Sequence, residues 1–384
     1  MDIELTTIII GCSVLLLSVV SSFFCPFFRR PAVNDTLPDN NGAKQDHPHI
    51  SIVMSARNQG DVLKKNLPRF LEQDYPKDAF EVIVVNESST DNTEDELKLL
   101  KAQHANLYTT FIPESSHYLS RRKLALTLGV KAAKNEWIVF VDAASQPVSS
   151  NWLTTLASYC NAENDIVCGY SNYDTETSKA YHRFRHLHTA LYQMRTAMRS
   201  QAYRYEGAQI AFRRQMFMQN NGFLKNLMYL RGEYDFIANE YSCEGRTAVM
   251  NAPDGILCQD APTPREWKNS QLFYMETRRH LRRTLPWRVL HNTDTFMQHI
   301  NWLAVMATLA CSLLTSDYIL TAAAAAAFII TALLRTTFIM KASDEYSERL
   351  PMLGVLFMEN SILWHNLWLM IIYKCSDKYD FIRK

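Results

Sequence analysis

The chain has 384 residues, of which 47% are hydrophobic and 21% charged, and its 40 Lys and Arg residues nearly balance its 39 Asp and Glu residues, which gives a net charge of +1. This balance argues against a protein whose main partner is a nucleic acid, because such proteins carry a surplus of basic side chains. The chain is too long for one average domain and too apolar to be mainly disordered, so we expect a globular unit of roughly 200 to 250 residues together with further segments.

The first predicted element is a membrane helix, since no charged residue occurs from Thr6 to Phe28. This stretch is long enough to cross a hydrocarbon core of about 30 Å. The alternatives are a cleaved secretory signal and a buried soluble helix. A signal fits poorly, because Asp2 and Glu4 precede the apolar stretch and no cleavage site of small residues follows it. Arg29 and Arg30 follow directly, and the positive charge of cytoplasmic segments predicts that the next part of the chain is cytoplasmic.

The central region begins after a polar stretch that we expect to be a linker, and it alternates apolar runs of strand length with segments of helical spacing. Such alternation predicts an α/β fold, in which a mostly parallel sheet is flanked by helices. The predicted elements are a strand at 50–56, a helix at 63–73, a strand at 80–85, a turn leading into a helix at 86–103, a helix at 122–134 and a strand at 136–141.

Polar or small residues follow each of the three predicted strands. They are Ala56 to Asn58 after the first strand, Asn86 to Ser89 after the second, and Asp142 to Ala144 after the third. In parallel sheets of this kind, ligands bind outside the carboxyl ends of the strands. We therefore expect the three segments to lie along one edge of the sheet and to form a ligand site.

Several motifs occur in a fixed order between Ile50 and Leu281. They are SIVMSARN, QDYP, FEVIVVNESSTDNT, KLALTLG, VFVDAASQP, GAQIAFRR, NNGF and GEYD. Their order and spacing resemble the family 2 glycosyltransferases, whose nucleotide-sugar-binding domain has the A-type glycosyltransferase fold. The resemblance implies transfer of a sugar from a nucleotide-sugar donor, in the first instance a UDP-sugar, to an acceptor. A nucleotidyltransferase is disfavoured, because SARNQGD supplies no Gly-rich phosphate loop.

The resemblance implies a set of nucleotide-sugar-binding residues. At Glu87, a carboxylate can accept a hydrogen bond from the imide N–H of uracil, although the neighbouring residues are also good helix caps. Lys123 begins a helix and follows two arginines, which suits an anionic ligand or an ordinary solvated surface. The full set is Ala56, Arg57, Asn58, Asn86, Glu87, Ser89, Lys123, Asp142 and Arg279.

Asp142 stands at the first position of the family's Asp-x-Asp motif, which holds the divalent cation that bridges the donor diphosphate. Carboxylate oxygens are the ligands that Mg²⁺ and Mn²⁺ prefer. Here Ala144 replaces the second Asp. Three outcomes are open: Asp142 and other groups hold the metal, positive side chains replace it, or the protein has no catalytic activity. A turn residue without a ligand is the further alternative for Asp142.

Inverting transfer needs a base that deprotonates the acceptor hydroxyl. In the family an acidic pair at the start of a helix provides it, and Glu233 and Asp235 are the candidates here, with Tyr234 at the second position of the pair. Glu233 and Asp235 do not share a helix face. Ordinary acidic residues favoured by the helix dipole are the alternative. Arg279 matches only the Arg of the family's Q-x-x-R-W motif, which disfavours processive synthesis. It either neutralises the leaving diphosphate or faces lipid phosphate.

The C-terminal part contains two uncharged runs, Ile300 to Ser316 and Tyr318 to Leu334, which predict a transmembrane hairpin or, alternatively, a buried soluble hairpin. A third stretch, Leu350 to Tyr373, contains polar residues, so we favour an interfacial or re-entrant helix over a third span. The basic segment from Tyr181 to Tyr205 predicts a surface helix that lies on anionic lipid or in solvent. The eight cysteines form no disulfide-like pattern, which agrees with a cytosolic catalytic part.

These observations predict four parts and a function. The parts are a transmembrane anchor at 1–30, a linker at 31–47, a catalytic domain at 48–285, and a transmembrane hairpin with an interfacial helix at 286–384. The expected function is that of a multi-pass cell-membrane protein, an inverting glycosyltransferase acting on a lipid-linked or saccharide acceptor at the cytoplasmic face. The alternative is a catalytically silent homologue that binds nucleotide sugars or serves as a scaffold subunit in a glycan-assembly complex.

Overall fold

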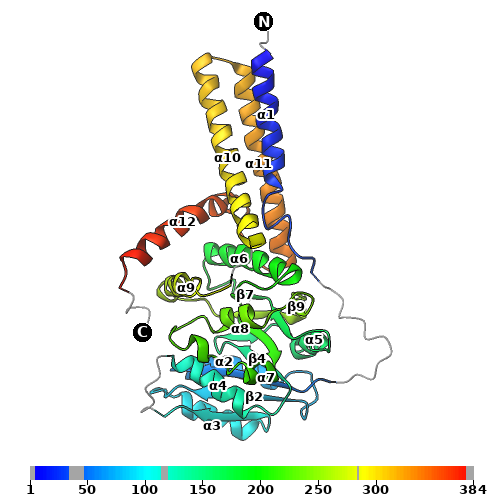
Figure 1. Ribbon diagram of the computed structural model, residues 1–384, viewed down its shortest axis with the longest axis vertical. Helices are drawn as coiled ribbons and strands as arrows, with labels where there is room; N and C mark the ends of the chain where they lie inside the picture. The colour runs from blue at the N-terminus through cyan, green and yellow to red at the C-terminus, as the bar shows by residue number, and fades with distance from the viewer. Residues whose placement is uncertain (1–4, 34–46, 114–119, 283–284, 378–384) are drawn as a thin grey trace, which may run out of the picture. The chain divides into compact units, whose positions relative to one another are not determined.

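The computed structural model describes residues 5–33, 47–113, 120–282 and 285–377 (Figure 1). The chain divides into two compact units. The first unit runs to Pro31 and resumes after Arg282 as far as Asn366, within α12, and the second covers Ala32 to Arg282 and resumes at Leu367. Residues 34–46 of the expected linker, and the extreme ends of the two expected terminal parts, lie outside the described residues.

A seven-stranded sheet with the order β3-β2-β1-β4-β8-β6-β9 forms the centre of the second unit. The pairs β3-β2, β2-β1, β1-β4 and β6-β9 are parallel, and β8 is antiparallel to both of its neighbours. The expected α/β fold with a mostly parallel sheet is therefore confirmed. The strands are β1 (Ile50–Ala56), β2 (Phe80–Asn86), β3 (Leu107–Phe111), β4 (Trp137–Val141), β6 (Ile166–Gly169), β8 (Gln209–Arg213) and β9 (Thr247–Met250).

A small second sheet has the order β5-β10-β7, and its strand β5 follows β4 in the sequence. Its strands are β5 (Ser145–Pro147), β7 (Ser171–Tyr173) and β10 (Leu257–Gln259). Gln259 pairs with Ser145, and the N–H of Asp260 donates to the carbonyl of Ala144 at 2.8 Å. This pairing fixes the backbone immediately after the predicted metal-binding position.

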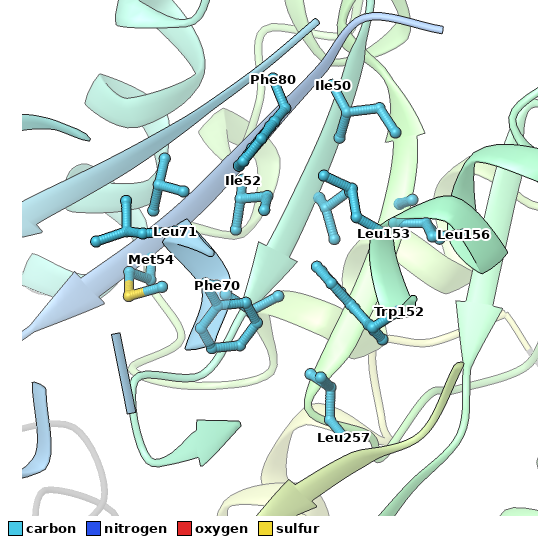
Figure 2. Close-up of a cluster of buried hydrophobic side chains, with 14 of the residues drawn as sticks. Ile50, Ile52, Met54, Phe70, Leu71, Phe80, Trp152, Leu153, Leu156 and Leu257 are labelled. Carbon is cyan, nitrogen blue, oxygen red and sulfur yellow. The ribbon is translucent and has the colours of Figure 1, made fainter. Parts of the chain in front are cut away.

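Helices cover both faces of the large sheet, as expected for strands that are apolar along their whole length. On one face, Ile50, Ile52 and Met54 of β1 pack in a cluster with Phe70 and Trp152, whose rings meet edge to face at 5.4 Å (Figure 2). The helices of this unit are α2 (Gly60–Leu71), α3 (Thr93–Gln103), α4 (Arg121–Ala132), α5 (Trp152–Tyr159), α6 (Ala180–Arg199), α7 (Arg214–Gln219), α8 (Glu233–Tyr241) and α9 (Pro264–Thr277).

On the other face, α4 approaches β1 so closely that it needs a glycine. A Cβ atom on Gly129 would lie 2.3 Å from Cγ1 of Val53. Successive residues of a strand point to opposite faces, which explains why Val53 meets α4 while its neighbours Ile52 and Met54 face the cluster around Trp152. The close packing sets the position of the first turn of α4 at the edge of the sheet.

The first unit contains α1 (Leu5–Ser22), α10 (Leu285–Thr315), α11 (Tyr318–Glu345) and the first part of α12 (Val355–Cys375). Four described helices are long and apolar enough to cross a membrane: Leu5–Ser22, Arg288–Thr315, Tyr318–Glu345 and Met352–Cys375. Polar side chains join them inside the unit. Asn301 of α10 accepts from the Ser18 hydroxyl of α1 at 2.9 Å and donates to Thr331 of α11 at 3.0 Å.

A buried ion pair links three of these helices. The Arg335 guanidinium of α11 makes two hydrogen bonds, of 2.8 and 3.0 Å, to the Glu359 carboxylate of α12. It also donates to the carbonyl of Ser21 at 3.1 Å. Both charged side chains are only 2% exposed. Breaking such a pair leaves an uncompensated buried charge, which costs far more than breaking a solvated pair.

Replacing Glu359 by Gln should lower the free energy of unfolding by about 3 kcal/mol, because the Arg335 charge loses its partner. The matched control is Glu345→Gln, which removes the 31% exposed carboxylate paired with Arg30. The control should lose less than about 1 kcal/mol. Denaturant unfolding of the purified chain in detergent measures both changes. Equal losses in the two variants would show that burial does not set the cost.

Candidate functional site

The loops after β1 and β2 are joined by side-chain hydrogen bonds. The N–H of Asn58 donates to the Ser89 hydroxyl at 2.9 Å, and the Asn58 carboxamide accepts from the N–H of Thr90 at 2.8 Å. Asn86, at the end of β2, accepts from the N–H of Ser89 at 2.9 Å. Asn58 has a left-handed backbone with φ of 51°, a conformation that Asn tolerates well. Asn58, Asn86 and Ser89 thus lie close together, as expected from the order of the strands.

The remaining residues of these loops lie at the same edge. The N–H of Glu87 donates to the carbonyl of Ala56 at 2.9 Å, which continues the strand pairing by one residue. The Glu87 side chain is buried, whereas Arg57 is exposed. Arg121 of α4 reaches the carbonyl of Glu87 at 3.5 Å. The first turn of α4 therefore adjoins the loop after β2.

One shared cap holds the two helices that follow these loops. The carboxylate of Asp91 accepts from the N–H of Gly60 at 3.2 Å and from the N–H of Thr93 at 3.1 Å. Gly60 begins α2 and Thr93 begins α3, so one side chain satisfies an amide in the first turn of each helix. Asp91 therefore caps both helices.

Asp142 forms an ion pair with the second arginine of α4. The Asp142 carboxylate accepts from Nη2 of Arg122 at 3.0 Å through one oxygen and from the N–H of Ala144 at 3.1 Å through the other. Burial by itself raises the pKa of Asp142, but the Arg122 charge and the Ala144 N–H outweigh it and hold this pKa below its ordinary value. Asp142 is therefore a carboxylate with both oxygens engaged.

The start of α8 brings further groups to Arg122. The Arg122 guanidinium carbon lies 5.9 Å from the centre of the Tyr234 ring, and the Glu233 carboxylate interacts electrostatically with the same guanidinium. Glu233 is buried, and its Oε1 atom has no hydrogen-bond partner among the described residues. We call Arg122, Asp142, Glu233 and Tyr234 the Arg122 cluster. It combines a cation held by an ion pair with a buried carboxylate oxygen that accepts no hydrogen bond from the described residues.

Asp235 points away from this cluster. Its carboxylate accepts from the N–H of Tyr205 at 3.0 Å and from Nε of Arg204 at 3.4 Å. Arg204 also pairs with Glu206 at 2.8 Å. Burial raises the pKa of Asp235 to about 6, although Arg204 opposes the shift. Glu233 and Asp235 thus occupy different environments, as their separation on a helix predicts.

The structure places Lys123 differently from the sequence interpretation. Its side chain is fully buried, and Nζ donates to the carbonyls of Asn226 and Tyr229, each at 2.6 Å. Burial lowers the pKa of this ammonium to about 8. Lys123 therefore holds the segment that precedes α8, and its ammonium is not presented to a nucleotide at the strand edge.

Arg279 follows α9 and is exposed. Its guanidinium carbon lies 5.3 Å from the centre of the Tyr373 ring. The neighbouring His280 stacks on Tyr229, with ring centres 4.2 Å apart. The described contact of the Arg279 side chain is therefore with the Tyr373 ring, and its neighbour His280 is the residue that packs on the segment before α8.

The basic segment around α6 is mostly part of the core. His182 stacks on Trp267 at 4.2 Å, and Nε2 of His186 lies 2.7 Å from the carbonyl of Ser171. Both histidines are buried, and burial lowers the pKa of His182 to about 4. The expected surface helix is therefore corrected for these residues, because their side chains pack inward and stay uncharged.

The residues present do not fit a divalent cation. Both oxygens of Asp142 are engaged, and Ala144 offers no ligand. Asp260, opposite Ala144, already accepts from Nζ of Lys65 at 2.7 Å and from Asn66 at 3.2 Å. Across the described ranges, no three His, Cys, Asp or Glu side chains are grouped so that they could hold a metal ion.

Sequence reasoning noted Arg122 only as part of a basic run and did not assign it to the site. The available signal was the combination of an arginine in the first turn of a helix with the loss of a carboxylate at Ala144. Neither feature alone shows that the two segments meet. The ion pair between Arg122 and Asp142 becomes visible only when α4 is packed on the sheet.

Comparisons with known proteins agree with this architecture. Residues 51–220 match the model of the family "Glycosyl transferase family 2". A relative from Methanococcus voltae, a dolichyl N-acetyl-alpha-D-glucosaminyl phosphate 3-beta-D-2,3-diacetamido-2,3-dideoxy-beta-D-glucuronosyltransferase, is 29% identical over 104 residues, which are 26% of this chain and 30% of the relative. The chain thus matches less than a third of that protein's length.

Solved structures are similar to this chain at low sequence identity. Mannosyltransferase PcManGT from Pyrobaculum calidifontis, in complex with GDP-Man and Mn²⁺, aligns with a TM-score of 0.51 and 17% identity over 88% of this chain and 97% of that one. S. aureus TarS 1-349 in complex with UDP-GlcNAc aligns with a TM-score of 0.42 and 13% identity over 83% of this chain and 92% of that one, too weakly to support an argument. The family match covers residues 51–220, which are less than half of this chain, and that segment is similar to a family 2 glycosyltransferase domain.

Proposed function

We propose that this protein is a membrane-anchored inverting glycosyltransferase, which moves a sugar from a nucleotide-sugar donor to a lipid-linked or saccharide acceptor at the cytoplasmic face. The observation that carries the proposal is the Arg122 cluster. It lies at the carboxyl edge of β4, where sheets of this kind bind ligands, and contains a buried carboxylate oxygen without a partner among the described residues. The donor is in the first instance a UDP-sugar. The relative named above, whose printed substrate is a dolichyl-linked sugar phosphate, supports a lipid-linked acceptor.

Glu233 is the proposed base. As the acceptor oxygen forms its bond to the anomeric carbon, its proton passes to Glu233, and the bond from the anomeric carbon to the donor phosphate oxygen breaks. The nucleoside diphosphate leaves with the bonding electrons, and its negative charge needs a nearby cation. Asp235 is less suited to the role, because Tyr205 and Arg204 already occupy its carboxylate.

Glu233→Gln should lower kcat for sugar transfer by about 10² to 10⁴-fold, because the amide cannot accept the acceptor proton. The dissociation constant for UDP should stay near that of the natural chain, since the change leaves Arg122 and Asp142 in place. The matched control is Glu240→Gln on the same helix, where the carboxylate pairs at 2.6 Å with the exposed Lys225. The control should keep wild-type kcat.

Transfer would be measured with a panel of radiolabelled UDP- and GDP-sugars and a lipid extract as acceptor. Unchanged kcat in Glu233→Gln would eliminate Glu233 as the base. Tight binding of nucleotide by the natural chain without turnover on any donor would instead identify a silent nucleotide-sugar-binding subunit.

Asp235 should affect the pH dependence of stability. In the folded chain it keeps its proton up to a pH of about 6, whereas its ordinary pKa is 3.8. The folded state therefore binds more protons between these values, and the free energy of unfolding should fall by roughly 1 to 3 kcal/mol as the pH rises through this window. Asp235→Asn cannot titrate and should lack this fall. Urea unfolding from pH 4 to 7 compares the two chains, and parallel curves would contradict the assignment.

The proposed membrane topology follows from the ends of the helices in the first unit. Arg29 pairs with Asp294, and Arg30 pairs with Glu345, so charged side chains gather where α1 and α11 end. At the opposite end, the Thr7 hydroxyl donates to Asp317 at 2.8 Å in the turn between α10 and α11. We assign the end with Arg29 and Arg30 to the cytoplasm, in agreement with the distribution of positive charge in membrane proteins.

The last turns of α12 favour an interfacial helix over a fourth span. Within the second unit, Leu369 packs against Leu272 and Met275 of α9, and the Tyr373 hydroxyl donates to Glu276. A helix whose last turns pack on α9 in this way is not surrounded by lipid along its whole length. Its exposed aromatic side chains, such as Trp364, suit the membrane surface.

The topology predicts which cysteines a membrane-impermeant thiol reagent reaches. Cys243 of the second unit is exposed and free, and it should react only after the cells are permeabilised. In a Ser316→Cys variant, the new thiol in the exposed turn before α11 should react in intact cells. Mass spectrometry of the labelled peptides measures both. Labelling of Cys243 in intact cells would reverse the assigned orientation.

A further inference from the structure

The segment directly after β4 carries one carboxylate, at Asp142, where the Asp-x-Asp motif of the family has two. Asp142 is present and Ala144 is not a ligand, so the donor diphosphate cannot be bridged by a cation held between these positions. The Asp142 carboxylate accepts Nη2 of Arg122 instead, at 3.0 Å. A basic side chain of this chain therefore touches the carboxylate that would otherwise bind the metal.

The net charge of the Arg122–Asp142 pair equals that of a site with two carboxylates and a divalent cation. Two carboxylates and one divalent cation sum to no net charge, and so do one carboxylate and one guanidinium. Loss of the carboxylate at Ala144 and gain of Arg122 as the partner of Asp142 are thus electrostatically matched.

We propose that the Arg122 guanidinium replaces the divalent cation as the group that binds the donor diphosphate, so that this enzyme works without a metal ion. The inference rests on the proposed glycosyltransferase function and adds a specific cation to it. Arginine suits the role because its planar fork of five N–H donors matches phosphate oxygens. The Arg122 side chain remains 23% exposed at the strand edge, so a ligand can reach it.

The surroundings keep this cation in place. Arg122 lies in the first turn of α4, which begins at the cap formed by Ser120. The Ser120 hydroxyl also donates to the carbonyl of Leu230 at 3.0 Å, and this ties the start of α4 to the segment that leads into α8. Arg122 is thus ion-paired with Asp142 after β4 and interacts electrostatically with Glu233, the proposed base.

The test measures binding of UDP and GDP to the full chain in detergent, by calorimetry, with either EDTA or Mn²⁺ present. The natural chain should bind one of the two with the same dissociation constant in both conditions. Arg122→Ala should raise that constant at least about tenfold, and Arg122→Lys should give an intermediate loss, because charge is kept but the fork is not. The matched control is Arg246→Ala, which breaks a two-point pair with Asp165 at the opposite edge of the sheet and should bind as the natural chain does.

If Arg122→Ala weakens the fold, the Arg122→Lys variant keeps the test decisive, because it retains the positive charge beside Asp142. A double variant tests whether a metal site can take the place of the guanidinium. Arg122→Ala combined with Ala144→Asp restores the second carboxylate and should regain nucleotide binding only when Mn²⁺ is present. Binding by the natural chain that EDTA abolishes and Mn²⁺ restores would overturn the inference and leave the proposed function intact. Wild-type affinity in Arg122→Ala would overturn it as well. Failure of the natural chain to bind either nucleotide in both conditions would remove the proposed function itself.

Discussion

The ion pair between Arg122 and Asp142 connects the parts of the second unit that matter for its chemistry. Asp142 ends β4 and Arg122 begins α4, so the contact joins the central sheet to the helix on its face. Helix α4 reaches this position because Gly129 lets it approach β1. The same guanidinium is next to Glu233 and Tyr234, so the start of α8 is organised around it too. The guanidinium of Arg122 therefore interacts both with Asp142, where the donor is proposed to bind, and with Glu233, the proposed base.

The sequence predicted the elements whose signal is local. The apolar runs at 50–56, 80–85 and 136–141 correspond to β1, β2 and β4 with only small shifts at their ends. Strands β3, β6, β8 and β9 were not predicted, and the antiparallel direction of β8 depends on pairing with residues distant in the sequence. A short apolar run cannot be assigned to a strand by periodicity alone.

The site shows the same division between local and distant information. The turn residues Asn58, Asn86 and Ser89 were placed together correctly by strand order, since parallel strands end at one edge. Burial was not readable, and it decides the role of Lys123, whose ammonium is closed in by two carbonyls. Helix geometry separated Glu233 from Asp235, but only the packed structure shows that Asp235 already has partners.

The shared cap at Asp91 has a consequence for motion at the strand edge. Because one carboxylate accepts the amides of both Gly60 and Thr93, the first turns of α2 and α3 cannot fray independently. Each turn lies directly after one of the two interlocked loops, so the amide protons of both loops should exchange with solvent in a single opening event. A ligand held by either loop would slow exchange in the other. In this way the edge responds to its ligand as one cooperative segment, although it is built from two separate stretches of the chain.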